Sequence, residues 1–545
     1  MRPQMSQYLL SLFTACMVAL TSRVEPGQAA ASEQEPQTMN SHRYTTATVM
    51  TFFIFVLAAI SSQATEQQGL KKILLKKSNG AVQATHSNET GKPHRLIVLT
   101  DIENEPDDTQ SMIRLLLYSD VIDLEGLIAT TSTHLRTGVA PDSIQALIGA
   151  YAKVHANLVK HSPGYPRPEV LSALVKQGRA EYGMGGVGTG KDSEGADWII
   201  RMLEKNDDRP LWISVWGGAN TLAQALHKLR ATKTAAETDR LVAKLRVYTI
   251  SDQDDSGPWI RKNFPTLFYI VSPGGHYGVA TWTGINNVIS GIDNSTISNK
   301  WLAENIQQGH GPLGAAYPDV AWGMEGDTPS WLGLIPNGLN DPEHPTFGGW
   351  GGRYELYRPE VPITDPRTFI GGVPIEQETR PIWTNAIDDY APPNYAEHGR
   401  ATRPGEKSFR DFKVTLWRWR DDFQRDFAAR VDWTIKPYAE ANHPPVPVLD
   451  HPGAITVRAG ERIELGAHKT SDPDGDSLSY FWFPYPEAGS YKGVVRINGA
   501  ENEKRASATA PKVEKPETLH FILRVTDKGS PSLSRYKRIV VTVTP

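Results

Sequence analysis

Hydrophobic and polar positions in the middle of the chain alternate in a pattern that is typical of an α/β fold. Short apolar runs, such as 96–100 and 210–218, are each followed by a segment with hydrophobic residues at helical spacing, such as 109–119 and 219–229. Further short apolar runs lie at 124–132, 245–251 and 267–273. Strands of a parallel sheet are buried on both faces and therefore form nearly continuous apolar runs. The pattern predicts a mainly parallel sheet with helices on both faces.

A different pattern follows a proline-rich segment at 441–448. Hydrophobic residues then alternate with polar ones in short stretches separated by Gly, Pro, Asp and Ser, which predicts a β-sandwich. A helix with an aromatic face, predicted at 417–433, would close the preceding domain. We therefore expect an α/β domain at 94–440 and an immunoglobulin-like β-sandwich domain at 441–545. The alternating stretches are 454–460, 462–467, 478–483, 520–527 and 537–545.

Two apolar stretches near the N-terminus, 9–20 and 50–60, are shorter than the about 20 residues that a membrane-spanning helix needs. They are typical of the apolar segment of secretory signal peptides. We predict a signal-peptide region at 1–64, within which translation starts at Met39, and then a flexible polar leader at 65–93. An N-terminal membrane anchor is the alternative interpretation.

The composition gives no indication of disulfides, of a reactive thiol or of a nucleic-acid partner. The single cysteine, Cys16, lies in the first apolar stretch, so the processed chain would contain no disulfide and no thiol. The net charge of −4 and the lack of a concentrated basic segment give no reason to expect a nucleic-acid partner. We predict a secreted or periplasmic protein with no stable membrane span after processing. The sequence does not predict its oligomeric state.

The segment 101–108 gathers five carboxylates directly after the first predicted strand: Asp101, Glu103, Glu105, Asp107 and Asp108. Ligands of open parallel sheets bind at the carboxyl ends of the strands. Carboxylate oxygens are the donors that Ca²⁺ prefers, and without a cation their repulsion would raise some of their pKa values. Two interpretations stay open, a solvated acidic loop and a calcium site.

The acidic segment resembles the N-terminal signature of the calcium-dependent nucleoside hydrolases, Asp-x-Asp-Pro-Gly-x-Asp-Asp. Asp101, Asp107 and Asp108 match its first and last two acids, and Glu103 stands at the position of its middle Asp. The resemblance implies that Glu103 or Asp107 accepts a proton from the attacking water. Because Glu is longer than Asp by one methylene, the metal geometry and the identity of the base stay open.

Two later segments extend this resemblance. "GGANTLAQAL" resembles the family's turn in which a backbone carbonyl binds calcium, and "EGDTPSWLGLI" resembles the start of its late metal-binding helix. The implied Ca²⁺ ligands are Glu103, Asp108, the carbonyl of Asn220, and Asp327, with Asp101 as a further ligand or a supporting residue. Asp341, which precedes a proline, is an alternative to Asp327.

The whole layout also resembles a bacterial family of cellulose-binding proteins that have a nucleoside hydrolase-like domain followed by a small β domain. The segments that carry this resemblance are the acidic run, "SDQDDSGPWIR", the tryptophan-rich segment 322–355 and the predicted β-sandwich. It implies a carbohydrate or nucleoside-like ligand, with cellulose as a candidate. Two functions follow: an exported Ca²⁺-dependent hydrolase of N-glycosidic or related glycosyl bonds, and, as the alternative, a carbohydrate-binding protein with a non-catalytic or altered site.

Several polar and aromatic residues near predicted strand ends are candidates for binding the substrate. Asp254, Asp255 and Trp259 follow the strand at 245–251, although an acidic turn that caps a helix would give the same pattern. A glycine-rich loop could close over a sugar, on which Trp350 would stack, or it could be a packed loop with Trp350 in the core. The substrate-binding candidates are Thr133, Asp254, Asp255, Trp259, Asn340, Asp341, His344, Trp350 and Arg353.

The predicted β-sandwich also contains an acidic loop, "SDPDGDSLSY". Its residues Asp472, Asp474 and Asp476 could hold a structural Ca²⁺ together with Asp527, or they could form an ordinary turn. The aromatic residues near 480–491 give only weak support for carbohydrate binding by this domain, because strand alternation places some of them in the core.

Overall fold

The computed structural model describes residues 91–272, 277–321, 323–360, 376–392 and 407–545. The predicted signal-peptide region and most of the predicted leader lie outside the described residues. Among the described residues, no helix combines the length and the hydropathy that crossing a membrane requires.

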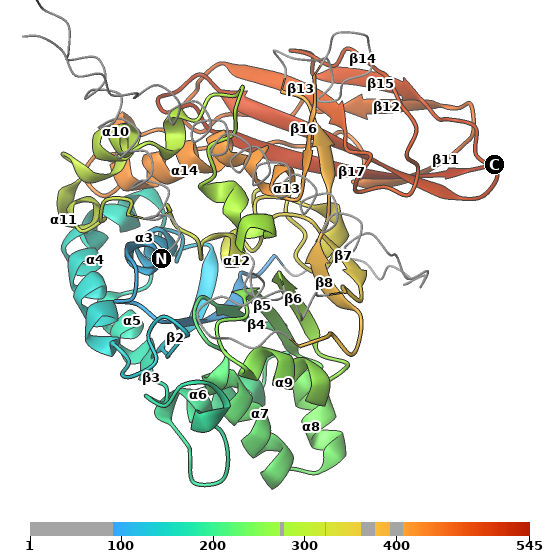
Figure 1. Ribbon diagram of the computed structural model, residues 1–545. Coiled ribbons are helices and arrows are strands. Elements are labelled where there is room, and N and C mark those ends of the chain that lie inside the picture. The colour runs from blue at the N-terminus through green and yellow to red at the C-terminus, as the bar shows by residue number, and fades with distance from the viewer. Residues whose placement is uncertain (1–90, 273–276, 322, 361–375, 393–406) are drawn as a thin grey trace, which may run out of the picture. The chain divides into compact units, whose positions relative to one another are not determined.

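An eight-stranded sheet forms the centre of the α/β domain, with the strand order β3-β2-β1-β4-β5-β6-β8-β7 (Figure 1). All neighbouring pairs are parallel except β7 and β8, which are antiparallel. The predicted mainly parallel sheet is therefore confirmed. The strands are β1 (His94–Thr100), β2 (Ile122–Ala129), β3 (Val175–Gln177), β4 (Leu211–Val215), β5 (Leu245–Ser251), β6 (Phe268–Ser272), β7 (Tyr354–Tyr357) and β8 (Ile382–Asn385).

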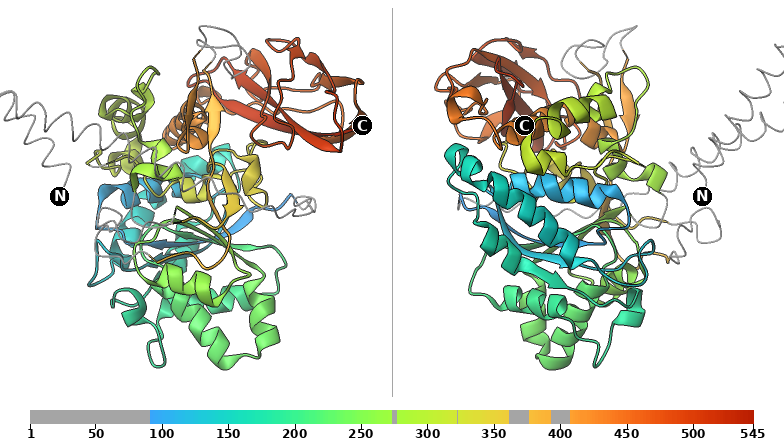
Figure 2. Two further views of the ribbon diagram at one scale, coloured as in Figure 1. Left: turned by 45° about the vertical axis from the view of Figure 1, so that its right-hand side comes forward. Right: turned by 90° about the vertical axis from the view of Figure 1, so that its left-hand side faces the viewer.

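Helices cover both faces of this sheet, because successive side chains of each strand point to opposite sides. In β1, Leu96 and Val98 pack with one group of helices, whereas Ile97 and Leu99 pack with the other. Figures 1 and 2 show the two layers. The first layer includes α3 (Pro106–Leu117), α4 (Pro141–His161), α5 (Pro168–Leu174), α10 (Asn299–Leu302), α11 (Gly311–Ala315), α12 (Pro329–Leu332) and α14 (Arg420–Asp432), and the second includes α6 (Glu194–Glu204), α7 (Asn220–Thr232), α8 (Ala235–Val242) and α9 (Ser256–Asn263).

The C-terminal strands form two facing sheets with a separate apolar core, as the alternating pattern predicts. Tyr480 and Trp482 are buried there, so neither belongs to an exposed aromatic row. One sheet has the order β11-β17-β16-β13 and the other β12-β15-β14. Their bounds are β11 (Ala454–Arg458), β12 (Arg462–Gly466), β13 (Leu478–Pro484), β14 (Ile497–Asn498), β15 (Arg505–Thr509), β16 (Glu517–Asp527) and β17 (Ser534–Thr544).

Helix α14 and the loop before β7 join the β-sandwich to the α/β domain. Asp426 on α14 accepts a hydrogen bond from Arg535 of β17 at 2.5 Å, and Arg538 donates to the carbonyl of Leu339 at 2.8 Å. Tyr485 is fully buried and belongs to the hydrophobic cluster of the α/β domain. The helix predicted at 417–433 is divided into α13 (Val414–Trp417) and α14, and a small sheet of β9 (Asp388–Tyr390) and β10 (Phe409–Asp411) lies beside it.

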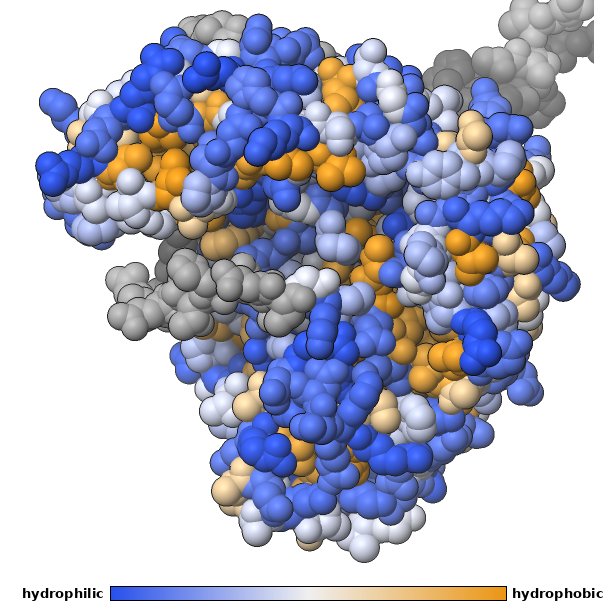
Figure 3. Space-filling model, turned by 180° about the vertical axis from the view of Figure 1, so that it is seen from behind, coloured by the Kyte–Doolittle hydropathy of each residue, from blue (hydrophilic) through white to orange (hydrophobic). Residues whose placement is uncertain are grey.

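The surface on the side opposite to Figure 1 is mainly hydrophilic, and its hydrophobic side chains form several small groups (Figure 3). Many of the large aromatic residues are instead inside the molecule. Trp216, Trp331, Trp350 and Trp482 are among the largest fully buried side chains. The high tryptophan content therefore serves mainly the cores.

Candidate functional site

Three aspartates from distant parts of the chain meet at the carboxyl end of β1. Carboxylate oxygens of Asp107, Asp108 and Asp327 lie within 4.8 Å of one another. Asp107 and Asp108 are in the first turn of α3, which follows β1, and Asp327 precedes α12. Asp101, the residue directly after β1, is buried beside them. We refer to Asp101, Asp107, Asp108 and Asp327 as the acidic site.

The local sequence explains how these carboxylates approach one another. Pro106 begins α3, where a missing N–H costs nothing, and the helix N-terminus favours the acids that follow. Two glycines, Gly217 and Gly326, leave space for the side chains of Asp101 and Asp107. A Cβ atom on Gly217 would lie 2.6 Å from Asp101 Oδ1, and one on Gly326 would lie 2.8 Å from Asp107 Oδ2. Neither position can take a larger residue without a displacement.

The acidic site is electrostatically unfavourable by itself. Burial raises the pKa of Asp101, Asp108 and Asp327, and mutual repulsion adds to this effect for Asp108 and Asp327. Burial raises the pKa of Asp107 to about 7, and repulsion from Glu105 and Asp101 contributes to this rise. Few hydrogen bonds offset this: Thr100 donates to Asp108, and Ser132 bonds to Asp101.

One oxygen of the acidic site has no partner. Asp327 Oδ2 is buried and accepts no hydrogen bond from any residue that the structure describes. Unpaired buried acceptors are costly and rare. A cation among these carboxylates would bind that oxygen and offset the repulsion. The donor set consists of hard oxygen atoms, so these residues fit Ca²⁺.

A buried ion pair connects the two segments that supply the carboxylates. Arg114 of α3 pairs with Glu325, and Glu325 also accepts hydrogen bonds from Tyr317 at 2.6 Å and from Thr328 at 2.9 Å. The backbone of Glu325 has a positive φ of 50°, which is uncommon for a residue other than glycine. These contacts fix the turn that presents Asp327 to α3.

Aromatic side chains line the acidic site and were not among the predicted residues. The His134 Nε2 atom lies 3.2 Å from the Tyr277 hydroxyl, and the Tyr277 ring packs edge-on against Trp282 with centroids 5.4 Å apart. Burial raises the pKa of Tyr277, and repulsion from Asp101 and its acidic neighbours raises it further, as expected for a tyrosine close to this acidic site. Tyr277 and Trp282 lie in short 3-10 turns without hydrophobic periodicity, which explains why the sequence pattern gave no signal.

Glu103 is not brought into the acidic site. Its side chain is exposed, and its Oε1 atom accepts a hydrogen bond from Ser143 Oγ at 2.6 Å. The positive φ of Glu103, 85°, turns the chain between β1 and α3 so that this side chain points away from the group. The placement therefore does not support the predicted roles of Glu103 as a metal ligand and as the base.

The Asn220 side chain is also used elsewhere. Its amide donates to Thr131 Oγ1 at 3.1 Å and to the Glu181 carbonyl at 2.8 Å, and its oxygen accepts from Thr130 at 2.8 Å. The proposed ligand was its backbone carbonyl, and that assignment stays a prediction.

The residues that follow β5 form hydrogen bonds with neighbouring loops and with the start of α7. Asp254 accepts a hydrogen bond from the N–H of Asn220 at 3.1 Å, at the start of α7, and burial raises its pKa to about 6. Asp255 accepts from the N–H of Met184 at 2.7 Å. The N–H of Thr133 donates to the Gln253 carbonyl at 2.6 Å, which ties its loop to the residues after β5.

Trp259 was predicted to bind substrate, but it packs away from the acidic site. It lies edge-on against Phe264 at 6.0 Å, and the guanidinium of Arg230 on α7 lies 5.5 Å from its ring. Arg230 belongs to α7 and Phe264 follows α9, and Trp259 packs against the hydrophobic cluster of this layer. Trp259 therefore stabilises helix packing, because α9 directs this face of the helix toward α7.

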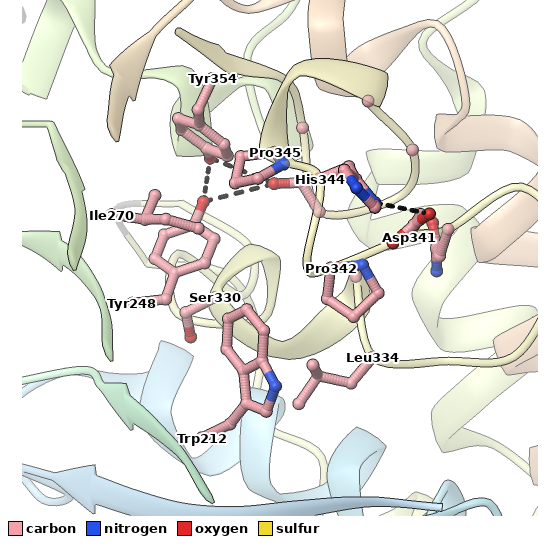
Figure 4. A pocket seen from close by; sticks show the side chains of 16 residues that line it. Trp212, Tyr248, Ile270, Ser330, Leu334, Asp341, Pro342, His344, Pro345 and Tyr354 are labelled. Carbon is pink, nitrogen blue, oxygen red and sulfur yellow. Dashed lines mark hydrogen bonds and ion pairs between the residues drawn. The ribbon is translucent and has the colours of Figure 1, made fainter. Parts of the chain in front are cut away.

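Most of the predicted sugar-binding loop lies at the other end of the sheet. Asp341 and His344 line a cavity of about 40 Å³ together with Trp212 of β4 and Tyr248 of β5 (Figure 4). The charge of Asp341 acts on His94, which begins β1, whereas Asp101 follows the last residue of that strand. A seven-residue strand spans roughly 20 Å, so this loop cannot contact a ligand at the acidic site.

Individual contacts give the physical reason for this placement. His344 Nδ1 lies 3.0 Å from Asp341 Oδ2. Asn340 donates to the carbonyls of Leu332 and Ile335 at 2.8 and 2.9 Å, which folds the loop back onto α12. Asn340, Asp341 and His344 are therefore structural parts of this loop or of its own cavity, and Asp341 does not replace Asp327.

Trp350 and Arg353 are core residues. Trp350 is fully buried and packs edge-on between Phe423 of α14 and Tyr536 of β17, so the prediction that it stacks on a sugar is wrong. Arg353 is buried in an ion pair with Asp388 at 2.7 Å. Trp350 packs the α/β domain against the β-sandwich, and Arg353 contributes through Asp388, which also accepts a hydrogen bond from the Tyr485 hydroxyl at 2.6 Å.

Comparisons with known proteins agree with this architecture. The family model described as "Cellulose-binding Sde182, nucleoside hydrolase-like domain" matches residues 95–354, and the one described as "Cellulose-binding protein Sde0182, C-terminal domain" matches residues 462–543. A solved structure of a nucleoside hydrolase-related hypothetical protein from Saccharophagus degradans, described as associated with carbohydrate metabolism, is 35% identical with a TM-score of 0.68. That match covers 83% of this chain and 100% of the other.

Two bacterial effector structures are matched much more weakly. The effector protein XOO4466 is 10% identical with a TM-score of 0.31, and the match covers 68% of this chain and 99% of the other. The type III effector XopQ, in complex with adenosine diphosphate ribose, is 11% identical with a TM-score of 0.24 over 46% of this chain and 68% of its own. No curated protein matches this chain.

Proposed function

Since this chain belongs to the family of cellulose-binding Sde182 proteins with a nucleoside hydrolase-like domain, we propose that it is an exported Ca²⁺-dependent hydrolase of N-glycosidic or related glycosyl bonds. The proposed substrate is a glycoside, because the similar protein from Saccharophagus degradans is described as associated with carbohydrate metabolism. The observation that carries the proposal is the buried Asp327 oxygen that has no partner among the described residues and lies beside the carboxylates of Asp107 and Asp108.

The carboxylates have different proposed tasks. Asp108 and Asp327 are the more deeply buried, and we assign them to hold the ion. Bound Ca²⁺ would supply positive charge that stabilises the ionised carboxylates and polarises an oxygen ligand. Asp101 is buried beside them, and its bond to Ser132 fixes its orientation.

Asp107 is the proposed general base. Its side chain is only partly buried, so it can reach a ligand, and one of its oxygens lies next to Gly326, against which Trp282 packs. Asp107 would accept the proton of a water whose oxygen bonds to the anomeric carbon while the glycosyl bond breaks. The electron pair of that bond leaves with the aglycone, which takes a proton from solvent, and neighbouring carboxylates would stabilise the positive charge that develops on the sugar. Glu103, which points away from the site, takes no part in this step.

His134, Tyr277 and Trp282 are the proposed contacts to the glycoside. An aromatic ring beside polar groups is a common arrangement in sites that bind sugars and nucleobases, because the ring covers the apolar face and the polar groups fix the orientation. Trp282 is partly buried and donates its Nε1–H to Ser251 at 3.1 Å, so its ring is held in place.

A carbohydrate-binding protein without turnover is the second candidate. It is favoured by the family description and by the position of Glu103, since the residue at the place of the family's middle Asp lies outside the acidic site. The two functions differ in one measurable property, the cleavage of a glycosyl bond.

The test combines turnover with binding. Purified protein is incubated with p-nitrophenyl riboside and related p-nitrophenyl glycosides, in calcium and in EGTA, and is separately sedimented with insoluble cellulose. A hydrolase releases nitrophenol only in calcium, and Asp107→Asn abolishes release while leaving the fold intact. Sedimentation with cellulose without release in any condition would instead identify the binding protein. Thr109→Ala, two residues after Asp107 in sequence, is the control variant for folding and purity.

A further inference from the structure

The acidic loop between β12 and β13 of the β-sandwich has the features of a second cation site. Carboxylate oxygens of Asp472, Asp474 and Asp476 lie within 4.8 Å of one another. Asp527, the last residue of β16, is 1% exposed; burial raises its pKa, and repulsion from Asp472 adds a smaller rise. Three carboxylates therefore meet in this loop. Asp527 lies near them, because it accepts a hydrogen bond from Asn442, and the next residue, His443, donates to Asp474.

An acidic loop is often only a turn, but here buried oxygens lack partners. Asp472 Oδ2, Asp527 Oδ2 and Asn442 Oδ1 are all buried and accept no hydrogen bond from any residue in the described ranges. Carboxylate and amide oxygens are acceptors only, so each of the three needs a donor or a cation. Three unpaired acceptors together are unfavourable in a folded protein.

The second carboxylate oxygen of Asp527 and that of Asp472 are held by hydrogen bonds. The unpaired oxygens therefore cannot rotate freely toward solvent. Asp527 Oδ1 accepts hydrogen bonds from Asn442 Nδ2 at 3.0 Å, the Gly529 N–H at 3.1 Å and the Leu533 N–H at 2.9 Å. Asp472 Oδ1 accepts from the N–H groups of Asp474 and Asp476. The bonds orient the remaining oxygens without satisfying them.

Among the described residues, Lys and Arg side chains do not neutralise the carboxylates of this acidic loop and Asp527. Within the described part of the chain, no Lys or Arg forms an ion pair with Asp472, Asp476 or Asp527, and Asp474 pairs only with His443, at 2.9 Å. An Asp474 oxygen has two lone pairs and can bond to both His443 and an ion. The negative charge of the loop is thus largely uncompensated.

We propose that this loop binds one Ca²⁺ ion, with ligands from Asp472, Asp474, Asp476, Asp527 and Asn442. The candidate ligands are all oxygens, and Ca²⁺ takes about six to eight such ligands in flexible geometry, whereas Zn²⁺ prefers nitrogen and sulfur. Mg²⁺ fits less well, because it demands near-ideal octahedral geometry and keeps several waters.

The site would also fix the segment that joins the two domains. Asn442 and His443 lie between α14 and the sandwich, and the N–H of His443 donates to Asp474 Oδ2 at 2.6 Å. The His443 ring stacks on Tyr438 at 3.9 Å and on Trp433 at 5.1 Å. Calcium bound by Asp474 and Asn442 therefore stabilises the connection between the domains as well as the loop.

Calorimetric titration of the calcium-depleted protein with CaCl₂ tests the inference separately from the proposed function. If both sites exist, two ions bind per chain. Asp472→Asn and Asp527→Asn each remove one binding event, Asp108→Asn removes the other, and Asp450→Asn, an acidic control in the same domain, removes neither. Retention of both events in Asp472→Asn and Asp527→Asn would overturn this inference, and retention of both in Asp108→Asn would instead overturn the calcium site of the proposed function.

A folding control keeps the test decisive. Circular dichroism in EGTA identifies any variant that does not fold, and Asp476→Asn, at a partly exposed position, then replaces it. Thermal unfolding gives a second reading: calcium should raise the Tm of Asp108→Asn, which retains the sandwich site, more than the Tm of the double variant Asp108→Asn/Asp472→Asn. Equal shifts in the two proteins would also overturn the inference.

Discussion

Arg114 Nε lies 2.6 Å from Glu325 Oε2, and both side chains are fully buried. This ion pair connects helix α3, which carries Asp107 and Asp108, to the turn that carries Asp327. The approach of the three carboxylates to within 4.8 Å therefore depends on an ion pair between two residues that are not part of the acidic site. Removing one partner of a buried pair leaves an uncompensated charge, which costs much more than an exposed pair is worth.

Glu325→Gln should therefore destabilise the protein strongly. We expect the free energy of unfolding to fall by about 3 kcal/mol, because Arg114 stays buried without its counter-charge. Chemical denaturation monitored by tryptophan fluorescence measures the change. Glu304→Gln, in the exposed pair with Lys300, is the matched control and should leave the midpoint unchanged. Equal midpoints for Glu325→Gln and the native protein would contradict the structural role of the pair.

Glu103→Gln should leave calcium binding at the acidic site unaltered, within about twofold, because the side chain is exposed and bonded to Ser143. Asp108→Asn, in contrast, should abolish that binding event, since it removes a buried charged ligand. Calorimetric titration compares the two variants. If Glu103→Gln weakens binding as much as Asp108→Asn does, Glu103 turns inward when calcium binds, and the resemblance to the middle Asp of the signature holds after all.

The tryptophans Trp282 and Trp350 should respond in opposite ways to truncation. Trp282→Ala should weaken binding of a glycoside by about two- to tenfold, because an aromatic contact is worth about 0.5–1.5 kcal/mol, with a small loss of stability. Trp350→Ala should cost about 3–5 kcal/mol of stability, because it empties a fully buried position between two domains. Ligand titration and denaturation, each performed on both variants, give the comparison. A loss of affinity in folded Trp350→Ala without a loss of stability would contradict the assignment.

The pair of His310 and Asp432 predicts a pH dependence away from both proposed metal sites. The two side chains lie 3.2 Å apart, and the hydrogen bond to Asp432 raises the pKa of His310 above its usual 6.5. A raised histidine pKa contributes stability that is fully present below pH 6.5 and is lost as the pH rises through the folded-state value. Asp432→Asn should thus lower the Tm at pH 5.5 more than at pH 8.5. A difference that is equal at both pH values would show that the charge on His310 does not contribute.

The parallel sheet could be predicted from sequence because burial on both faces leaves a direct trace, the apolar runs of β1, β2, β4, β5 and β6. The position of Asp101, Asp107 and Asp108 follows from the same pattern, since parallel strands present their carboxyl ends at one edge. The short strands β14 and β15 could not be found in this way. β14 has two residues, and β15 consists of Arg, Ala, Ser and Thr without a clear apolar face.

The candidate site was predicted less completely than the fold, for reasons that particular residues make clear. The glycines around Trp350 resemble a surface loop, but they allow the backbone to pack closely while the ring fills an interdomain core. Trp282 is brought to Asp107 by a packing contact with Gly326, which no local pattern reveals. The direction of the Glu103 side chain depends on the positive φ of its own backbone. The periodicity of hydrophobic and polar residues carries no information about that angle.

Anomalous diffraction from a crystal grown with calcium tests most directly whether the buried carboxylates hold an ion. We predict a peak in the acidic site, about 2.3–2.6 Å from the nearest oxygens of Asp108 and Asp327, including the unpartnered Oδ2 of Asp327. Fully ordered carboxylates with no peak between them at millimolar calcium would contradict the proposed calcium-dependent function.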